Sequence, residues 1–364
     1  MIKIRTFLIL AVATVVVVVA AIVFSSMNAP AKMAQGERDY AFPKLVERIN
    51  DAASIEIRSH DHTFTVTGSG ENWGIAEKNN YRVPRQTVRN FLVEIANLRL
   101  VEGRTERDDR YARLNVDDPK ADKSEARGIK VTLKDGTVLA DGIVGRRKYF
   151  LYVDGRGGTY IRRTGEKRSW LAEGEVGFGK SPAEWLDRLV FEIPTAEVKR
   201  YTITHPDGTT LIGDKAERGG KVEIRGGIPA DRKFRTDTEA DRVNLVVEKF
   251  EFEDVFPKGH VDFAGFTGQR NTAEFVTFDG LAITFETLTF PKPEGASEYE
   301  EPPRFGRVRA SVAADAPADK REEVAKRAAE LNARMEPWEY KLEWLDGSRT
   351  TKKLEEMLEP KEQS

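Results

Sequence analysis

An apolar stretch near the start of the chain limits most strongly how this sequence can fold. No charged residue lies between Arg5 and Lys32, and the stretch from Phe7 to Phe24 is apolar apart from one threonine. A helix over this stretch would be about 27 Å long at ~1.5 Å per residue, close to the ~30 Å hydrocarbon core of a bilayer. The sequence therefore predicts one transmembrane helix, with residues 1–25 forming a cytoplasmic tip and membrane anchor.

The charges that flank this stretch predict its orientation. Lys3 and Arg5 precede it, and the next charged residue is Lys32. Because positive charge is retained on the cytoplasmic side, we expect a cytoplasmic N-terminus and an extracytoplasmic body. The alternative is a cleaved signal peptide. Ala29-Pro30-Ala31 matches a cleavage site poorly because of its proline, and whether the helix is ever cleaved stays open. Residues 26–40 follow as a linker.

The composition of the chain excludes several classes of function. Lysine and arginine number 58 against 60 aspartates and glutamates, so no basic field is available to bind nucleic acid. Cysteine is absent, which excludes disulfides, zinc fingers and thiol nucleophiles. The 364 residues, 40% of them hydrophobic, are enough for two folding units with their own cores. We therefore expect a modular globular body behind the anchor.

Residues 41–193 have the pattern of an α+β unit. The unit begins with a hairpin over 54–66, a short strand at 73–75, an amphipathic helix over 84–96 and a strand over 98–102. Hairpins around Asp135-Gly136 and Asp154-Gly155 follow, and a connecting helix over 181–193 ends the unit. The second of these hairpins comprises strands over 149–153 and 159–163. Asp-Gly between alternating apolar residues is a strong hairpin signal, so the sheet is predicted to be antiparallel.

Residues 194–364 repeat that order. A hairpin around Asp207-Gly208 is followed by a strand at 222–224, a helix over 237–247, a strand over 250–255 and a hairpin around Asp279-Gly280. Three further elements close the chain, namely a charged helix over 319–335, a strand over 338–344 and a helix over 350–358. We therefore predict tandem duplicated units of antiparallel sheet, each with a packed helix, preceded by the transmembrane helix.

Few residues have a pattern that would carry chemistry. His60-Asp61-His62 could approach a metal, but the spacing is more typical of a surface hairpin turn. His205 beside Pro206-Asp207-Gly208 is interpreted in the same way. Acid pairs such as Glu300-Glu301 are interpreted as solvated loop charge, and the five tryptophans as core or sheet-face residues. Neither a nucleophile elbow nor a phosphate-binding loop occurs. The prediction is no enzyme, with no catalytic, cofactor-binding or metal-binding residue and no cofactor.

The motifs of the first unit resemble a known bacterial family. The segment from Phe42 to Ile57, the motif Tyr81-Arg82-Val83-Pro84, the stretch from Tyr111 to Pro119 and the segment from Ser181 to Arg188 are similar to the domain-of-unknown-function 4340 family. Members of that family are described as auxiliary components of a gliding-motility-type ABC transport system. Arg113 stands where the family commonly has glycine, a departure that concerns loop geometry only.

This resemblance implies a function by association. It implies one N-terminal anchor in the bacterial inner membrane, a periplasmic body of repeated units, and an ABC permease and a companion extracytoplasmic subunit as partners. It implies no catalytic residue. We therefore expect an auxiliary subunit that acts by protein–protein docking. The alternative from a different class is a periplasmic lipid- or glycan-binding module that holds its ligand between the two repeats.

Overall fold

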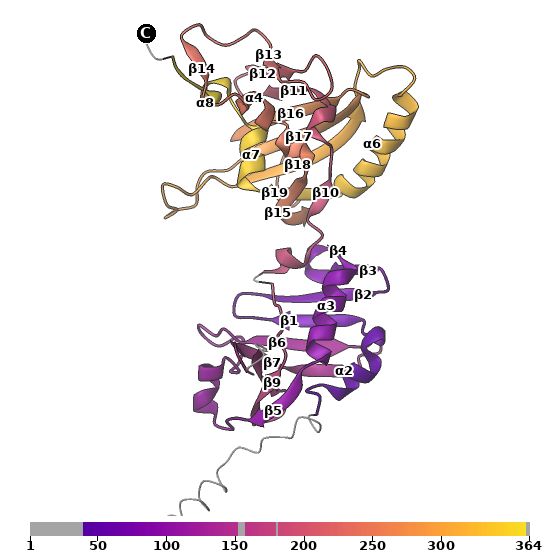
Figure 1. The fold of residues 1–364 in the computed structure, drawn as a ribbon, viewed down its shortest axis with the longest axis vertical. Coiled ribbons are helices and arrows are strands. Elements are labelled where there is room, and N and C mark those ends of the chain that lie inside the picture. Colours follow the sequence, from indigo (N-terminus) through magenta and orange to yellow (C-terminus); the bar gives the residue numbers. More distant parts are fainter. Residues whose placement is uncertain (1–38, 152–156, 180, 362–364) are drawn as a thin grey trace, which may run out of the picture. The chain divides into compact units, whose positions relative to one another are not determined.

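A computed structural model describes residues 39–151, 157–179 and 181–361. The described chain has an α+β fold built on two large antiparallel sheets (Figure 1). It divides into two compact units. The first contains the described residues up to Glu77 together with Val83–Pro182, and the second contains Lys78–Arg82 and the residues from Ala183 onward. In this division residues 183–193 fall in the second unit.

The first sheet has nine strands in the order β4-β3-β2-β1-β6-β7-β8-β9-β5. Their bounds are β1 Ser54–Arg58, β2 Thr63–Ser69, β3 Asn72–Ile75, β4 Tyr81–Val83, β5 Arg99–Gly103, β6 Arg127–Thr132, β7 Val138–Lys148, β8 Gly158–Arg163 and β9 Ser169–Glu173. Helices α2 (Pro43–Arg48) and α3 (Arg85–Ala96) pack against each other, α2 against β7 and α3 against β3. Tyr40, the last residue of the expected linker, forms a bridge with Arg99.

The second sheet also has nine strands, in the order β10-β15-β19-β18-β17-β16-β11-β12-β13. Their bounds are β10 Leu189–Phe191, β11 Val198–Thr204, β12 Thr210–Asp214, β13 Glu223–Ile224, β15 Phe250–Pro257, β16 Gln269–Thr277, β17 Leu281–Thr289, β18 Arg304–Val312 and β19 Trp338–Leu342. A separate two-stranded sheet pairs β14 (Arg232–Phe234) with β20 (Leu358–Pro360). The helices are α4 Glu239–Arg242, α5 Leu245–Glu248, α6 Arg321–Met335, α7 Trp344–Thr350 and α8 Leu354–Met357.

The two sheets share one strand order. Eight neighbouring strands of the first run β3-β2-β1-β6-β7-β8-β9-β5, and eight of the second run β13-β12-β11-β16-β17-β18-β19-β15. Adding ten to each label of the first series gives the second. In both sheets a hairpin and a third strand lead into helical residues, and a second hairpin continues the sheet from the first strand.

Asp-Gly turns close three of the predicted hairpins. Gly136, Gly208 and Gly280 have φ of 84°, 83° and 93°, a left-handed conformation that glycine adopts without steric cost. They connect β6 to β7, β11 to β12 and β16 to β17, as the sequence predicted. The fourth turn, Asp154-Gly155, lies outside the described residues.

An aromatic cluster forms the core of the second unit. Phe250, Phe252, Phe285 and Tyr340 are each fully buried. The ring of Phe250 lies 5.1 Å from that of Phe285 and 5.5 Å from that of Tyr340, both in edge-to-face geometry. Because these rings come from β15, β17 and β19, they hold strands together that are distant in sequence.

Helix α6 packs on the second sheet through few apolar residues. Its buried side chains are Val324, Ala328 and Met335. Asn332 Nδ2 donates to the carbonyl oxygen of Ala310 at 2.8 Å, and the amide of Ala310 donates to Asn332 Oδ1 at 2.7 Å. Asn332 therefore satisfies both backbone groups of this β18 residue, as a neighbouring strand would.

The predicted connecting helix over 181–193 is wrong. A single 3-10 turn covers Pro182–Trp185, and β10 follows at Leu189–Phe191. The ring of Phe191 lies 5.3 Å from that of Phe250 across the β10–β15 pair. Burial of this apolar run against the aromatic cluster outweighs its helical spacing.

Four other predicted elements also differ. Strand β7 ends at Lys148, and Phe150 has a φ of 53°, which does not fit the strand predicted over 149–153. The helix predicted over 237–247 is divided at Asn244 into α4 and α5. The last predicted strand ends at Leu342, and α7 and α8 replace the helix predicted over 350–358.

Within the described residues, no helix is long and apolar enough to cross a membrane. The apolar stretch from Phe7 to Phe24 lies outside those residues.

Candidate docking groove

A groove of about 600 Å³ opens on the second unit. Its floor is formed by Glu253 of β15 and by Lys341 and Leu342 of β19, and Trp344 stands where α7 begins. The remaining lining comes from a loop rich in proline and glutamate and from the first residue of β18, namely Pro293, Tyr299, Glu300, Glu301, Pro302, Pro303 and Arg304. The groove is therefore open, with strands below it and a helix and a loop at its sides.

Large apolar side chains are exposed at this groove. Tyr299 is 92% exposed and Trp344 57%, and the neighbouring Leu345 is 45% exposed. Trp344 was predicted to continue the strand. The backbone leaves the sheet after Leu342 because α7 starts at Trp344, and the indole ring projects to solvent at the end of the helix instead of onto the sheet. Aromatic rings exposed in this way are typical of contact surfaces.

Arg304 contacts both the loop and α7. Its side chain is only 12% exposed, and its Nη2 lies 3.7 Å from Glu301 Oε2. A Cβ on Gly347 of α7 would lie 2.7 Å from Arg304 Cδ, so the helix can approach this closely only with glycine at that position. Burial lowers the pKa of Arg304, and its Nε and Nη1 have no hydrogen-bond partner in the described structure. The groove wall therefore includes an incompletely satisfied cation.

Asp346 is a largely buried titratable group of α7. The residue is 7% exposed, and Arg349 Nη1 donates to its Oδ1 at 2.7 Å. Burial raises the pKa of Asp346 to about 6, because desolvation outweighs the attraction of Arg349. The folded state therefore favours the neutral carboxyl.

Replacing this carboxyl should stabilise the protein at neutral pH. Between pH 3.8, the ordinary pKa of the carboxyl, and about pH 6, Asp346 is protonated in the folded state and ionised in the unfolded state. The stabilisation associated with neutral Asp346 is therefore lost as the pH rises through that range. We expect Asp346→Asn to raise the free energy of unfolding at pH 7.5 by about 1–3 kcal/mol and to have little effect near pH 4. Urea unfolding at the two pH values measures the difference. Asp319→Asn, at an exposed position, is the control and should change neither value. An equal effect of Asp346→Asn at both pH values would contradict the argument.

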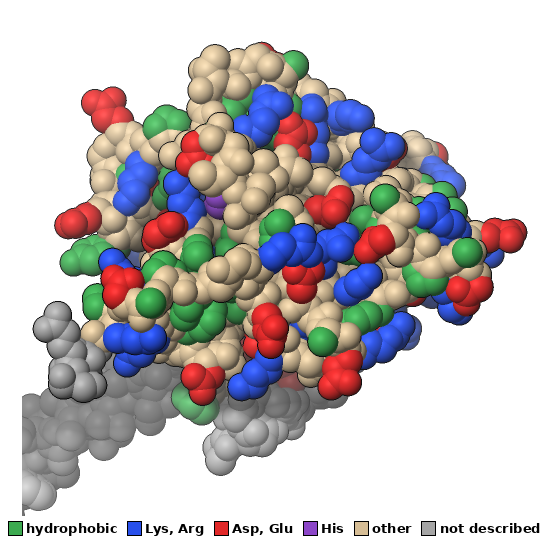
Figure 2. All heavy atoms as spheres, turned by 90° about the horizontal axis from the view of Figure 1, so that it is seen from above, with side chains coloured by type: hydrophobic (Ala, Val, Ile, Leu, Met, Phe, Trp, Pro, Cys, Tyr) green, Lys and Arg blue, Asp and Glu red, His purple; other side chains and the backbone are tan. Residues whose placement is uncertain are grey.

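Negative charge exceeds positive charge along the loop of the groove. From Pro291 to Pro303 there are four glutamates and one lysine, Lys292. At the groove itself Lys341 is paired with Glu253, and Arg304 lies near Glu301. Glu300 has no ion pair or side-chain hydrogen bond within the described part of the chain. Elsewhere acidic and basic side chains are interspersed, as on the face in Figure 2.

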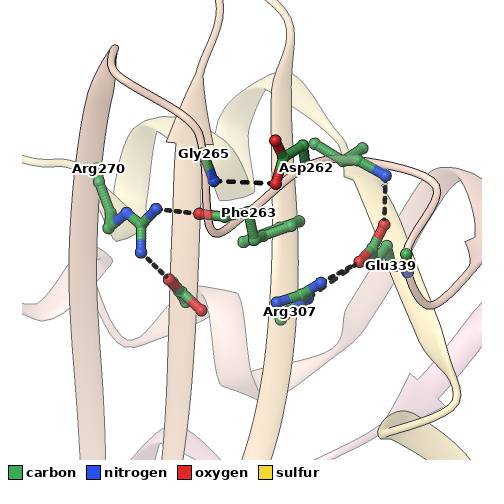
Figure 3. Close-up of polar contacts among 9 residues, drawn as sticks. Asp262, Phe263, Gly265, Arg270, Arg307 and Glu339 are labelled. Atoms are coloured by element: carbon green, nitrogen blue, oxygen red, sulfur yellow. Dashed lines mark hydrogen bonds and ion pairs between the residues drawn. The ribbon is translucent and has the colours of Figure 1, made fainter.

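A second polar cluster lies in the same unit and has a structural role. The side chain of Glu339 is fully buried and accepts hydrogen bonds from the amides of Gly259 at 2.9 Å and Val261 at 2.7 Å (Figure 3). Arg307 Nε donates to it at 3.0 Å and also lies over the Phe263 ring, 4.0 Å from its centre. Because both carboxylate oxygens accept from loop amides, Glu339 holds the loop after β15 against β19.

The residues singled out in the sequence do not come together. His60, Asp61 and His62 are exposed in the turn between β1 and β2, closed by a hydrogen bond from the Ser59 amide to the His62 carbonyl. No group of three or more metal-ligating side chains occurs among the described residues. The predicted turn at His205 is present, but its ring is buried and its Nδ1 lies 2.9 Å from Asn271 Nδ2. Burial lowers the pKa of His205, so its neutral form is favoured.

Sequence comparison places the chain in a family. The profile of the family described as "Domain of unknown function (DUF4340)" matches residues 73–265, which is more than half of the chain. The chain belongs to the DUF4340 family. The match confirms the resemblance found in the sequence motifs. Searches of curated proteins and of solved structures gave no match to this DUF4340 protein.

Sequence analysis missed the groove of this DUF4340 protein for an identifiable reason. Glu300-Glu301 and Trp344 were noted separately, as loop charge and as a strand residue. They come together because α7 starts two residues after β19 ends and because Arg304 brings the loop against Gly347. A tyrosine between glutamates and prolines, at Tyr299, is the feature of the sequence that marks this loop.

Proposed function

We propose that this protein is a membrane-anchored, extracytoplasmic auxiliary subunit of an ABC-type transport or envelope complex that acts by protein–protein docking. The observation that carries the proposal is the groove between β15, β19, α7 and the loop 293–304, with Tyr299 and Trp344 exposed. The apolar stretch from Phe7 to Phe24 supports a single-pass anchor in the bacterial inner membrane. In this account the protein positions a partner and performs no reaction.

We also propose that the two units arose by tandem duplication. The shared order of eight strands supports this origin, because two sheets that formed independently would rarely agree in the place of eight of their nine strands. In the second unit α7 follows β19, whereas among the described residues of the first unit no α-helix follows its counterpart β9. Docking is therefore assigned to the second unit.

Recovery of the partner from native membranes tests the docking proposal. The full-length protein, solubilised in mild detergent after cross-linking, should retain an ABC permease or a companion extracytoplasmic subunit. The double variant Tyr299→Ala, Trp344→Ala should lose most of that partner, because both side chains are exposed and their loss leaves the fold intact.

A matched control uses exposed aromatic residues of the first unit. Tyr149 and Phe150 are 67% and 81% exposed, and the double variant Tyr149→Ala, Phe150→Ala should retain the partner. Loss of the partner only in this control would place docking on the first unit. Absence of any transporter component with the wild-type chain would refute the proposed function.

A second candidate function is a lipid- or glycan-binding module. It is supported by a groove of about 430 Å³ within the first unit, where the apolar side chains of Trp73, Val88 and Leu92 lie beside Arg85 and Arg89. An apolar floor with cationic groups at its mouth would suit an anionic lipid. Native mass spectrometry of the purified protein would reveal a retained lipid, whereas the docking account predicts none.

A further inference from the structure

The groove on the second unit has a composition that selects among partners. Exposed aromatic rings contribute apolar contact area, and their π-faces attract cations. Carboxylates beside them add charge-assisted hydrogen bonds to ammonium and guanidinium groups. Tyr299 and Trp344 supply the rings, and Glu300 supplies a carboxylate that no basic side chain of the described structure neutralises.

Resting on the proposed function, we propose that this groove binds an extended segment of the partner protein that carries lysine or arginine. The cationic side chain of that segment lies against Trp344 and Tyr299 and pairs with Glu300. Neighbouring apolar residues of the segment contact Leu342 and the proline walls, Pro293, Pro302 and Pro303. The groove thus recognises a basic polypeptide.

The negative charge of the loop disfavours anionic ligands in the groove. Four glutamates against one lysine between Pro291 and Pro303 repel anionic lipids and anionic glycans. At the groove Lys341 pairs with Glu253 and Arg304 lies beside Glu301, so Glu300 is the carboxylate of the described lining that has no basic partner. A cationic segment is the complementary partner.

The manner of binding follows from the elements that form the groove. Glu253 and Lys341 lie on strands that pair with each other, with Asp254 opposite Lys341 in the register. The facing edges of β15 and β19 are therefore used in pairing with each other, and the partner cannot add as a further strand between them. Recognition is by side chains, and the bound segment lies across the faces of β15 and β19.

Fluorescence anisotropy with labelled octapeptides tests this inference. The probes are a lysine- and leucine-containing octapeptide, the same peptide with each lysine replaced by glutamate, and the same peptide with glutamine. The full-length protein in detergent should bind the lysine peptide at least about tenfold more tightly than the glutamate peptide. Trp344→Ala should weaken that binding by about tenfold, and added salt should weaken it further.

Charge-reversal variants provide the matched comparison. Glu300→Lys should weaken binding of the lysine peptide by about tenfold and improve binding of the glutamate peptide. Glu323→Lys makes the same charge change on α6, where the Glu323 side chain is 75% exposed and outside the groove, and should leave both affinities unchanged. Equal effects of the two variants would show a non-specific charge effect and overturn the inference.

The outcomes separate this inference from the proposed function. If the permease or companion subunit is recovered with the wild-type chain and lost with the groove variant, but no peptide is preferred, docking stands and the assigned partner chemistry is wrong. If a neutral oligosaccharide or an anionic vesicle binds at the groove in place of the lysine peptide, the inference is also wrong. If no partner is recovered while the lysine peptide binds as described, the proposed function fails and the recognition chemistry stands.

Discussion

Replacing Glu339 with alanine should lower the free energy of unfolding of the second unit by roughly 3–5 kcal/mol. The side chain of Glu339 is fully buried, and its removal leaves the amides of Gly259 and Val261 without their acceptor. The guanidinium of Arg307 also loses its carboxylate partner. Glu339→Gln should cost less, because its carbonyl oxygen can still accept from one of these donors.

Urea unfolding combined with hydrogen exchange measures this effect. In Glu339→Ala, hydrogen exchange should accelerate most at the amides of Gly259 and Val261. A general loss of stability would instead accelerate exchange throughout the unit. Glu323→Ala removes a glutamate whose side chain is 75% exposed and should change the stability by less than about 0.5 kcal/mol. Equal stability of Glu339→Ala and the wild-type chain would contradict the arrangement in Figure 3.

Replacing Phe285 with alanine should also lower the free energy of unfolding by roughly 3–5 kcal/mol. Phe285 is fully buried on β17, and its ring lies 5.1 Å from that of Phe250 and 5.9 Å from that of Phe275. Truncation removes these edge-to-face contacts and leaves a cavity among strands that cannot collapse around it. Phe285→Leu should cost less, because leucine fills most of the space.

The control for the core variant is an exposed residue of the same type. Phe150 is 81% exposed, so Phe150→Ala should alter stability by less than about 0.5 kcal/mol. Thermal and urea unfolding of the three variants give the comparison. If Phe285→Ala and Phe150→Ala had similar stabilities, the aromatic cluster would not be the core of the second unit.

Local signals in the sequence were sufficient for much of the fold. Three Asp-Gly steps predicted the hairpins that connect β6 to β7, β11 to β12 and β16 to β17, because a left-handed glycine turn is set by residues adjacent in sequence. The amphipathic spacing over 84–96 predicted α3, whose buried residues lie on one face. The first hairpin, the third strand, the helix, the strand after it and the second hairpin of the two units were matched in the sequence, and the two sheets share that order.

Features that depend on distant contacts could not be predicted in this way. The sequence did not single out Glu339, because the two amides that bind it lie in the loop after β15, about 80 residues earlier in the chain. The run Leu189–Phe191 became a strand because it pairs with β15. The groove likewise depends on the approach of the loop at Arg304 to Gly347, which leaves no periodic pattern in the sequence.

The location of the body outside the cytoplasm is the central claim, and cysteine labelling tests it most directly. The natural chain contains no cysteine, so Glu323→Cys on the exposed face of α6 introduces a single thiol. In spheroplasts, a membrane-impermeant maleimide should label this variant fully without lysis, and the cysteine-free parent should remain unlabelled. Labelling of Glu323→Cys only after the membrane is broken would place the body in the cytoplasm and contradict the account.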